Sequence, residues 1–225
     1  MTRTTNARIA GFTYLFYIAV AFPSMVLLDR ATSGEGMAAK LASMAQRATD
    51  VHVAVVLALL GCFSALVLAV TLYAITREQD PDLAMLGLTC RVAEGVTGAV
   101  SLPATLGLLW LATATGANAP DPAATQSLGA FVLKQNPLVG ATFFAVGSTL
   151  FSYLLLRGRT VPVPLAWLGV FASVLLVVGL PLQLGGLLRG PVTSLMWLPM
   201  AGFEVPVGLW LLVKGVPLER RHELN

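Results

Sequence analysis

Charged residues are scarce in this sequence. They make up 11% of its 225 residues, whereas hydrophobic residues make up 56%. About a quarter of the residues of a soluble domain are charged, so this composition excludes an ordinary water-soluble fold and favours a protein of the lipid bilayer. The net charge is only +3, and the basic residues cluster at the ends of apolar runs. That pattern is typical of membrane topology signals, and it argues against a nucleic-acid partner.

Cysteine and histidine are rare as well, with two of each. Cys62 and Cys90 fall in separate apolar runs, at depths that differ by roughly 10 Å at 1.5 Å per residue. This separation is too large for a disulfide, so we expect two free buried thiols. The sequence also lacks a zinc-binding cluster, a phosphate-binding loop and an Asp-rich diphosphate motif. We therefore predict no metal and no cofactor.

Long apolar runs dominate what remains. Six of them reach the roughly 20 residues that a helix needs to cross a bilayer. They cover residues of about 9–28, 51–75, 83–113, 138–156, 163–188 and 194–213. We predict an all-α integral membrane bundle of six transmembrane helices, in which residues 1–225 form a single transmembrane domain.

Two longer polar stretches, 33–50 and 115–137, separate spans on one side of the membrane. In the first, apolar residues recur at helical spacing opposite basic ones, namely Met37, Leu41 and Met44 against Lys40 and Arg47. This spacing predicts a short amphipathic helix lying on the membrane, with a solvated loop as the alternative. In the second, residues 126–134 are predicted to form another interfacial helix.

The distribution of basic residues predicts the orientation of the bundle. Six spans place both termini on one side, where the turns are short. With the termini inside, eight basic residues are cytoplasmic: Arg3, Arg8, Arg77, Arg157, Arg159, Lys214, Arg220 and Arg221. Five lie outside: Arg30, Lys40, Arg47, Lys134 and Arg189. The excess favours a multi-pass protein of the bacterial-type inner (plasma) membrane with cytoplasmic N- and C-termini.

Three charged residues interrupt the apolar runs. Arg91 and Glu94 lie in the third run, and Glu204 lies in the sixth. Counted from the cytoplasmic ends, their depths are roughly 14, 18 and 15 Å, near the middle of a core about 30 Å thick. An unpaired charge there costs at least about 2.5–3.5 kcal/mol. We therefore predict that Arg91 bridges the two carboxylates and that the third and sixth helices are adjacent.

Polar and aromatic residues share helix faces at this depth. In the third span, Ser101 falls on the face of Arg91 and Glu94; in the first, Tyr14 and Tyr17 form a stripe; in the sixth, Trp197 shares a face with Glu204. We interpret these faces as a pocket rimmed by aromatic rings. The alternative is that the Arg–Glu pair only fixes helix register and that the aromatic residues face lipid or the core.

Several short motifs resemble a known family. They are Arg8-Ile9-Ala10-Gly11 at the start of the first span, Arg91-x-x-Glu94 in the third, and Glu204 followed by the run from Gly208 to Gly215. Together they resemble a bacterial family of six-span proteins known only as a domain of unknown function. The architecture is also similar to the small, cofactor-free integral-membrane terpene cyclases of drimentine-type and meroterpenoid pathways. That similarity implies a buried acid that protonates an alkene or an epoxide.

The buried acids lead to one main functional hypothesis and two alternatives. The first is a membrane enzyme acting on a lipid-soluble, isoprenoid-type substrate by proton-initiated cyclisation. Burial favours a neutral carboxyl group, and two carboxyls around Arg91 allow one to stay ionised while the other, Glu94 or Glu204, carries the proton. The alternatives are a proton-coupled transporter, since each half of the chain carries a Glu-x-x-x-Gly in its third span, and an accessory membrane subunit.

Overall fold

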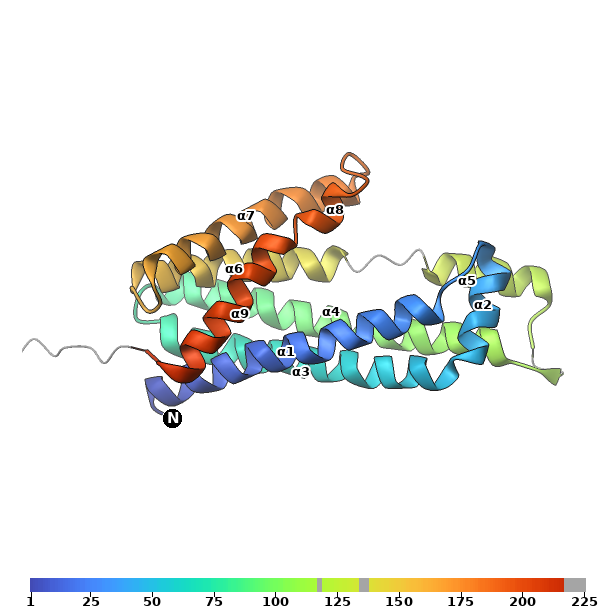
Figure 1. The fold of residues 1–225 in the computed structure, drawn as a ribbon, viewed down its shortest axis with the longest axis horizontal. Coiled ribbons are helices and arrows are strands. Elements are labelled where there is room, and N and C mark those ends of the chain that lie inside the picture. The colour runs from blue at the N-terminus through green and yellow to red at the C-terminus, as the bar shows by residue number, and fades with distance from the viewer. Residues whose placement is uncertain (117–118, 134–137, 217–225) are drawn as a thin grey trace, which may run out of the picture.

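The computed structural model describes residues 1–116, 119–133 and 138–216, and this part of the chain is helical without a strand. The helices are α1 (Arg3–Ala31), α2 (Gly36–Gln46), α3 (Ala48–Thr76), α4 (Pro81–Thr113), α5 (Pro122–Leu133), α6 (Leu138–Arg157), α7 (Val163–Leu184), α8 (Val192–Leu195) and α9 (Leu198–Val213). They form an elongated bundle (Figure 1). We call the end where α1 begins and α9 finishes the terminal end, and the end with α2 and α5 the cap end.

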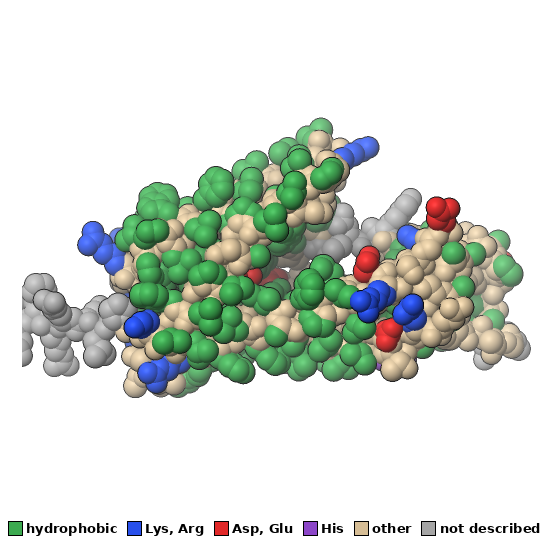
Figure 2. Space-filling view, in the orientation of Figure 1, with side chains coloured by type: hydrophobic (Ala, Val, Ile, Leu, Met, Phe, Trp, Pro, Cys, Tyr) green, Lys and Arg blue, Asp and Glu red, His purple; other side chains and the backbone are tan. Residues whose placement is uncertain are grey.

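Six helices are long and apolar enough to cross a membrane. The prediction of an all-α membrane bundle with six spans is therefore confirmed. Three of the basic residues used to predict the orientation, Lys134, Arg220 and Arg221, lie outside the described residues. Hydrophobic side chains cover the middle of the face in Figure 2, and basic side chains gather toward the two ends. This distribution is the one expected of a multi-pass membrane protein.

Local sequence explains where the helices begin and end. The hydroxyl of Thr2 caps α1 by accepting a hydrogen bond from the amide of Thr5, so α1 starts earlier than the predicted residue 9. Helix α7 finishes at Leu184 rather than 188 because Gly185 and Gly186, the latter at φ +73°, turn the chain. The sixth span is broken: α8 stops before Met196, and α9 starts at Leu198, with Pro199 in its first turn.

Three helices are much longer than the membrane is thick. Helices α1, α3 and α4 have 29, 29 and 33 residues, or roughly 43 to 50 Å, against about 30 Å of hydrocarbon. At the cap end they extend past α7 and α8 and meet α2 and α5 (Figure 1). A separate apolar cluster forms there, built from Ala31, Leu41, Met44, Val51, Leu108, Leu109 and Leu111.

The cap corrects one prediction and refines another. Residues 33–50 do contain an amphipathic helix, α2, with Leu41 and Met44 buried. However, α2 buries this face against protein, packing on α4 and α5, and does not lay it on lipid. The second predicted interfacial helix corresponds to α5, which ends at Leu133 within the described residues.

Close helix contacts set the order of the bundle. Helix α9 packs on α1 and α7, whereas α4 packs on α3 and α6. The prediction that the third and sixth spans are adjacent is therefore wrong. Small residues explain the observed neighbours: a Cβ on Gly11 of α1 would lie 2.5 Å from the carbonyl oxygen of Gly208 on α9, so only glycine allows this approach.

Candidate functional site around Arg91

The side chain of Arg91 is the largest fully buried one in the molecule as described, with 1% exposure. It lies on α4, and its Nη1 is 2.8 Å from Oε2 of Glu94, one helical turn further on. Its guanidinium carbon is 4.8 Å from the ring centroid of Phe144 on α6 and 6.0 Å from that of Tyr17 on α1. One carboxylate and two aromatic rings thus lie around the charge, and both kinds of group attract a cation.

A glycine on the neighbouring helix makes room for this arginine. A Cβ on Gly147 of α6 would lie 3.0 Å from Cγ and 3.1 Å from Cδ of Arg91. The aliphatic part of the arginine therefore runs over the bare backbone of α6. This passage directs the guanidinium toward Phe144, which precedes Gly147 by three residues and so shares its face of the helix.

Glu94 has a second partner on a third helix. The phenol of Tyr17 donates a hydrogen bond to Oε1 of Glu94 at 3.2 Å. Its other oxygen, Oε2, contacts Arg91, although that contact lacks hydrogen-bond geometry. Both oxygens of Glu94 are thus engaged by protein groups, and the carboxylate serves as the counterion of Arg91.

Glu204 differs from Glu94 in having no such partner. It is 7% exposed, and no described hydrogen bond or ion pair involves it. It lies close enough to Arg91, Glu94, Tyr14 and Tyr17 to interact with them electrostatically. Some polar atoms are fully shielded from solvent without a hydrogen-bond partner, and the two carboxylate oxygens of Glu204 are not among them. The predicted bridge is therefore half right: Arg91 pairs with Glu94, while Glu204 stands apart with an open carboxyl group.

The space beside these acids lies on the cap side. Along α4 the buried residues include Gly87, Cys90, Arg91, Glu94 and Gly95, but none of residues 96–107 is buried. Over these roughly three turns of α4 the side chains are covered less completely than those around Arg91 and Glu94. Figure 2 shows the molecule hollowed between α9 and the middle of α1, with acidic side chains at the floor. Glu94 and Glu204 are the described acidic residues that lie far from helix ends.

The terminal side of the site is closed. The main hydrophobic core fills the bundle between the acids and the terminal end, with fully buried residues from α1, α3, α6 and α9: Ala7, Leu72, Ile75, Leu154, Leu155 and Leu211. Access to Glu204 is therefore from the hollow.

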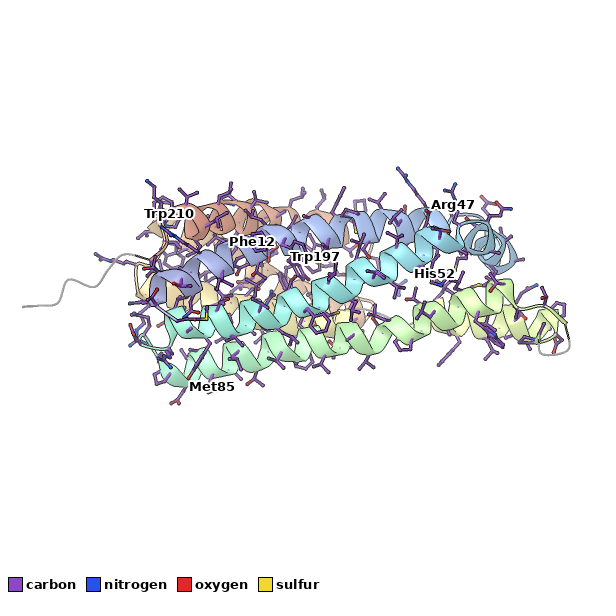
Figure 3. All side chains as sticks on the ribbon, turned by 90° about the horizontal axis from the view of Figure 1, so that it is seen from below. Phe12, Arg47, His52, Met85, Trp197 and Trp210 are labelled. Carbon is purple, nitrogen blue, oxygen red and sulfur yellow. The ribbon has the colours of Figure 1, made fainter. Side chains whose placement is uncertain are left out.

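Three of the four aromatic or polar residues predicted for the pocket come together here. Tyr17 binds Glu94, and Tyr14 is buried against Gly208 of α9. Trp197 lies midway along the molecule (Figure 3), with its ring centroid 6.0 Å from that of Phe144. Ser101 is apart: it is exposed, and its hydroxyl donates to the carbonyl of Gly98 in its own helix.

Phe144 is the site residue that sequence reasoning missed. It is one of two adjacent phenylalanines in an apolar run, Phe143 and Phe144, and nothing in the run distinguishes them. In the structure Phe143 is exposed and Phe144 is buried under Arg91. Gly147, three residues later, was the available signal, because small residues mark close approach between membrane helices.

Comparison with known proteins places most of the chain in one family. Residues 9–215 match a domain of unknown function, DUF4386. No curated protein and no solved structure matches the chain.

Proposed function

The chain belongs to the DUF4386 family, whose function is unknown, and we propose that it is a membrane enzyme that protonates a lipid-soluble, isoprenoid-type substrate and thereby starts its cyclisation. The observation that carries the proposal is Glu204: a mid-membrane carboxyl group without a described partner, opening onto a hollow beside the buried ion pair of Arg91 and Glu94.

The neighbouring charges suit Glu204 to carry a proton. Glu94 neutralises Arg91 and is itself held by Tyr17, so a second carboxylate in the same place would be an excess negative charge. Two interacting acids beside one cation share their protons as a pair. We assign Glu204 as the proton donor that touches the substrate, and Arg91 and Glu94 as positioning residues.

Aromatic rings supply the second requirement of such chemistry, which is stabilisation of a carbocation by ring faces. Arg91 already occupies one face of Phe144. Tyr14, Tyr17 and Trp197 remain as the candidate walls of the substrate space. Their positions support this assignment, because the two tyrosines lie within electrostatic range of Glu204 and Trp197 packs on Phe144.

The proposed reaction balances without a cofactor. Glu204 transfers its proton to one carbon of a double bond, which leaves a cation on the neighbouring carbon. A second double bond of the same molecule attacks that cation and closes a ring. Loss of a proton from an adjacent carbon to the Glu204 carboxylate restores the acid, and the product is an isomer of the substrate.

The proposed setting is the bacterial-type inner membrane, with both termini in the cytoplasm. In that orientation the cap faces outward, and a lipophilic substrate reaches the hollow from the half of the bilayer nearer the cap. The partners are then membrane lipid and a lipophilic small molecule, without a nucleic acid.

The test uses the full-length protein in lipid nanodiscs with a panel of linear polyprenyl compounds in D₂O. We expect a cyclic isomer that carries one deuterium, since the donated proton exchanges with solvent. Glu204→Gln should abolish the product while helicity is retained, and Glu35→Gln, an exposed acid-to-amide change before α2, should leave it intact. Full activity in Glu204→Gln would refute the role of this acid.

One observation favours a second candidate, a proton-coupled transporter. The span that carries Glu204 is discontinuous at Met196 and Trp197, and broken helices are a feature of transporter binding sites. Proteoliposomes with an internal pH dye separate the candidates. Solute-driven proton movement that is lost in Glu204→Gln would support transport, whereas deuterated product without proton movement would support the enzyme.

A further inference from the structure

A groove of about 460 Å³ lies at the terminal end of the bundle, far from the site around Arg91. The start of α1 and the end of α3 form its walls. Arg3 and Asn6 line it from α1, Val70 and Ala74 from α3, and Arg77 and Glu78 from the turn that follows. The groove thus combines apolar and charged residues in one short stretch of surface.

Among the described residues that line the groove, the positive charges outnumber the negative one. Nη1 of Arg3 is 3.0 Å from Oε2 of Glu78, and Nη2 of Arg3 donates to the carbonyl of Ile75. Arg77 has no carboxylate partner among the described residues. Its guanidinium carbon lies 6.0 Å from the ring centroid of Tyr73, on the helix turn before it. Glu78 therefore offsets Arg3, and the charge of Arg77 remains to attract an anion.

The apolar part of the groove faces the membrane. Val70 is 56% exposed on the lipid-facing side of α3, and it precedes Arg77 by two turns, roughly 10 Å along the helix axis. A molecule in the groove would meet apolar side chains first and a guanidinium at the edge of the hydrocarbon. A phospholipid has the same order, with acyl chains followed by a phosphate.

We propose that this groove binds one anionic phospholipid, with its phosphate at Arg77 and an acyl chain along Val70 and Ala74. Basic pockets between helix ends at the membrane surface are suited to anionic headgroups, and the planar guanidinium pairs with phosphate through two parallel hydrogen bonds. The site does not depend on the chemistry proposed for Glu204, because the two are separated by the packed core of the bundle.

Native mass spectrometry of the full-length protein in detergent tests the proposal, with dioleoyl phosphatidylglycerol and dioleoyl phosphatidylcholine added separately. We expect one tightly bound phosphatidylglycerol, whereas phosphatidylcholine should bind more weakly and without reaching saturation. Arg77→Gln should weaken the phosphatidylglycerol site by about fivefold, the effect of one basic residue near an anionic lipid. Arg8→Gln is the matched control, since Arg8 is exposed at the same end of α1 but does not line the groove.

Two further arms separate a lipid site from a simple anion site. Val70→Trp should fill the acyl part and lower phosphatidylglycerol binding without removing a charge. Millimolar inorganic phosphate should leave the bound lipid in place. Equal binding of both lipids, an equal loss in Arg8→Gln, or displacement of the lipid by inorganic phosphate would each overturn the proposal.

Discussion

The phenol of Tyr17 on α1 donates a hydrogen bond to Oε1 of Glu94 on α4, 3.2 Å away, while Oε2 of the same carboxylate contacts Arg91. This relationship joins two helices that share few other contacts, since α1 packs mainly on α3 and α9. It also uses both oxygens of Glu94. The geometry separates the two buried acids into a counterion, Glu94, and an open carboxyl group, Glu204.

Tyr17→Phe removes this bond with little change in shape. A hydrogen bond to a charged group contributes about 1.5–3 kcal/mol, so we expect the free energy of unfolding to fall by about 2 kcal/mol. Denaturant unfolding in mixed micelles, followed by circular dichroism, measures the change. Tyr153→Phe is the control, because Tyr153 is exposed on α6 and has no described hydrogen bond. Equal effects in the two variants would contradict the assignment.

Removing both members of the ion pair should cost less than the sum of the two single removals. Arg91→Met leaves Glu94 as a buried charge without its cation, and Glu94→Gln leaves Arg91 as a buried charge without its carboxylate. Each should lower the free energy of unfolding by about 3–5 kcal/mol, whereas the double variant should lose clearly less than the sum. The four unfolding curves of this mutant cycle give the coupling directly. Additive losses would mean that the 2.8 Å contact carries no net interaction.

Gly147→Ala tests whether the passage over α6 positions Arg91. The added methyl group would lie 3.0 and 3.1 Å from Cγ and Cδ of the arginine, so the side chain must shift. We expect a loss of about 1–3 kcal/mol, as for other overpacked sites, together with reduced activity. Gly202→Ala on α9 is the control, since a Cβ there meets nothing within 4 Å. A neutral result for Gly147→Ala would show that Arg91 can move freely.

Gly11→Ala should separate α1 from α9. Its methyl group would lie 2.5 Å from the carbonyl oxygen of Gly208 and 2.9 Å from the carbonyl carbon of Leu211. Both are backbone atoms, which cannot rotate away as a side chain does. We expect a loss of about 3 kcal/mol, at the upper end of overpacking. Gly107→Ala on α4, with open space around it, should be neutral in the same unfolding assay.

The orientation can be read by cysteine labelling in intact bacterial cells. If the termini are cytoplasmic, a membrane-impermeant maleimide should label Ser127→Cys, exposed on α5 of the cap, without permeabilisation. Asp82→Cys, exposed at the start of α4, should be labelled only after the membrane is opened. The reverse pattern would place the cap in the cytoplasm and contradict the orientation predicted from the basic residues.

Hydropathy located the spans well because a helix in lipid must satisfy its own backbone hydrogen bonds, so an apolar run of sufficient length has few other structures open to it. The ends were less predictable. The break before Leu198 depends on Pro199, and the start of α1 depends on the cap at Thr2. Neither residue changes the average hydropathy of its segment.

The neighbours of each helix could not be inferred in the same way. Depth alone placed Arg91 level with Glu204 and so favoured adjacent third and sixth spans. The observed order depends instead on where backbones can approach, as at Gly11 with Gly208 and at Gly95, where a Cβ would lie 3.1 Å from the carbonyl oxygen of Cys62. The chain contains 21 glycines, and the sequence alone does not show which of them lie at close contacts between helices.

The partners Arg91 and Glu94 belong to one helix, a single turn apart, and this has a consequence for biosynthesis. A span leaving the translocon meets lipid before later spans have been made. Because the two opposite charges of α4 touch each other without help from any other helix, that segment can partition sideways as an electrically neutral unit. Tyr17 is already present by then, whereas Phe144 and Glu204 arrive afterwards, so the cation is compensated before its full surroundings exist.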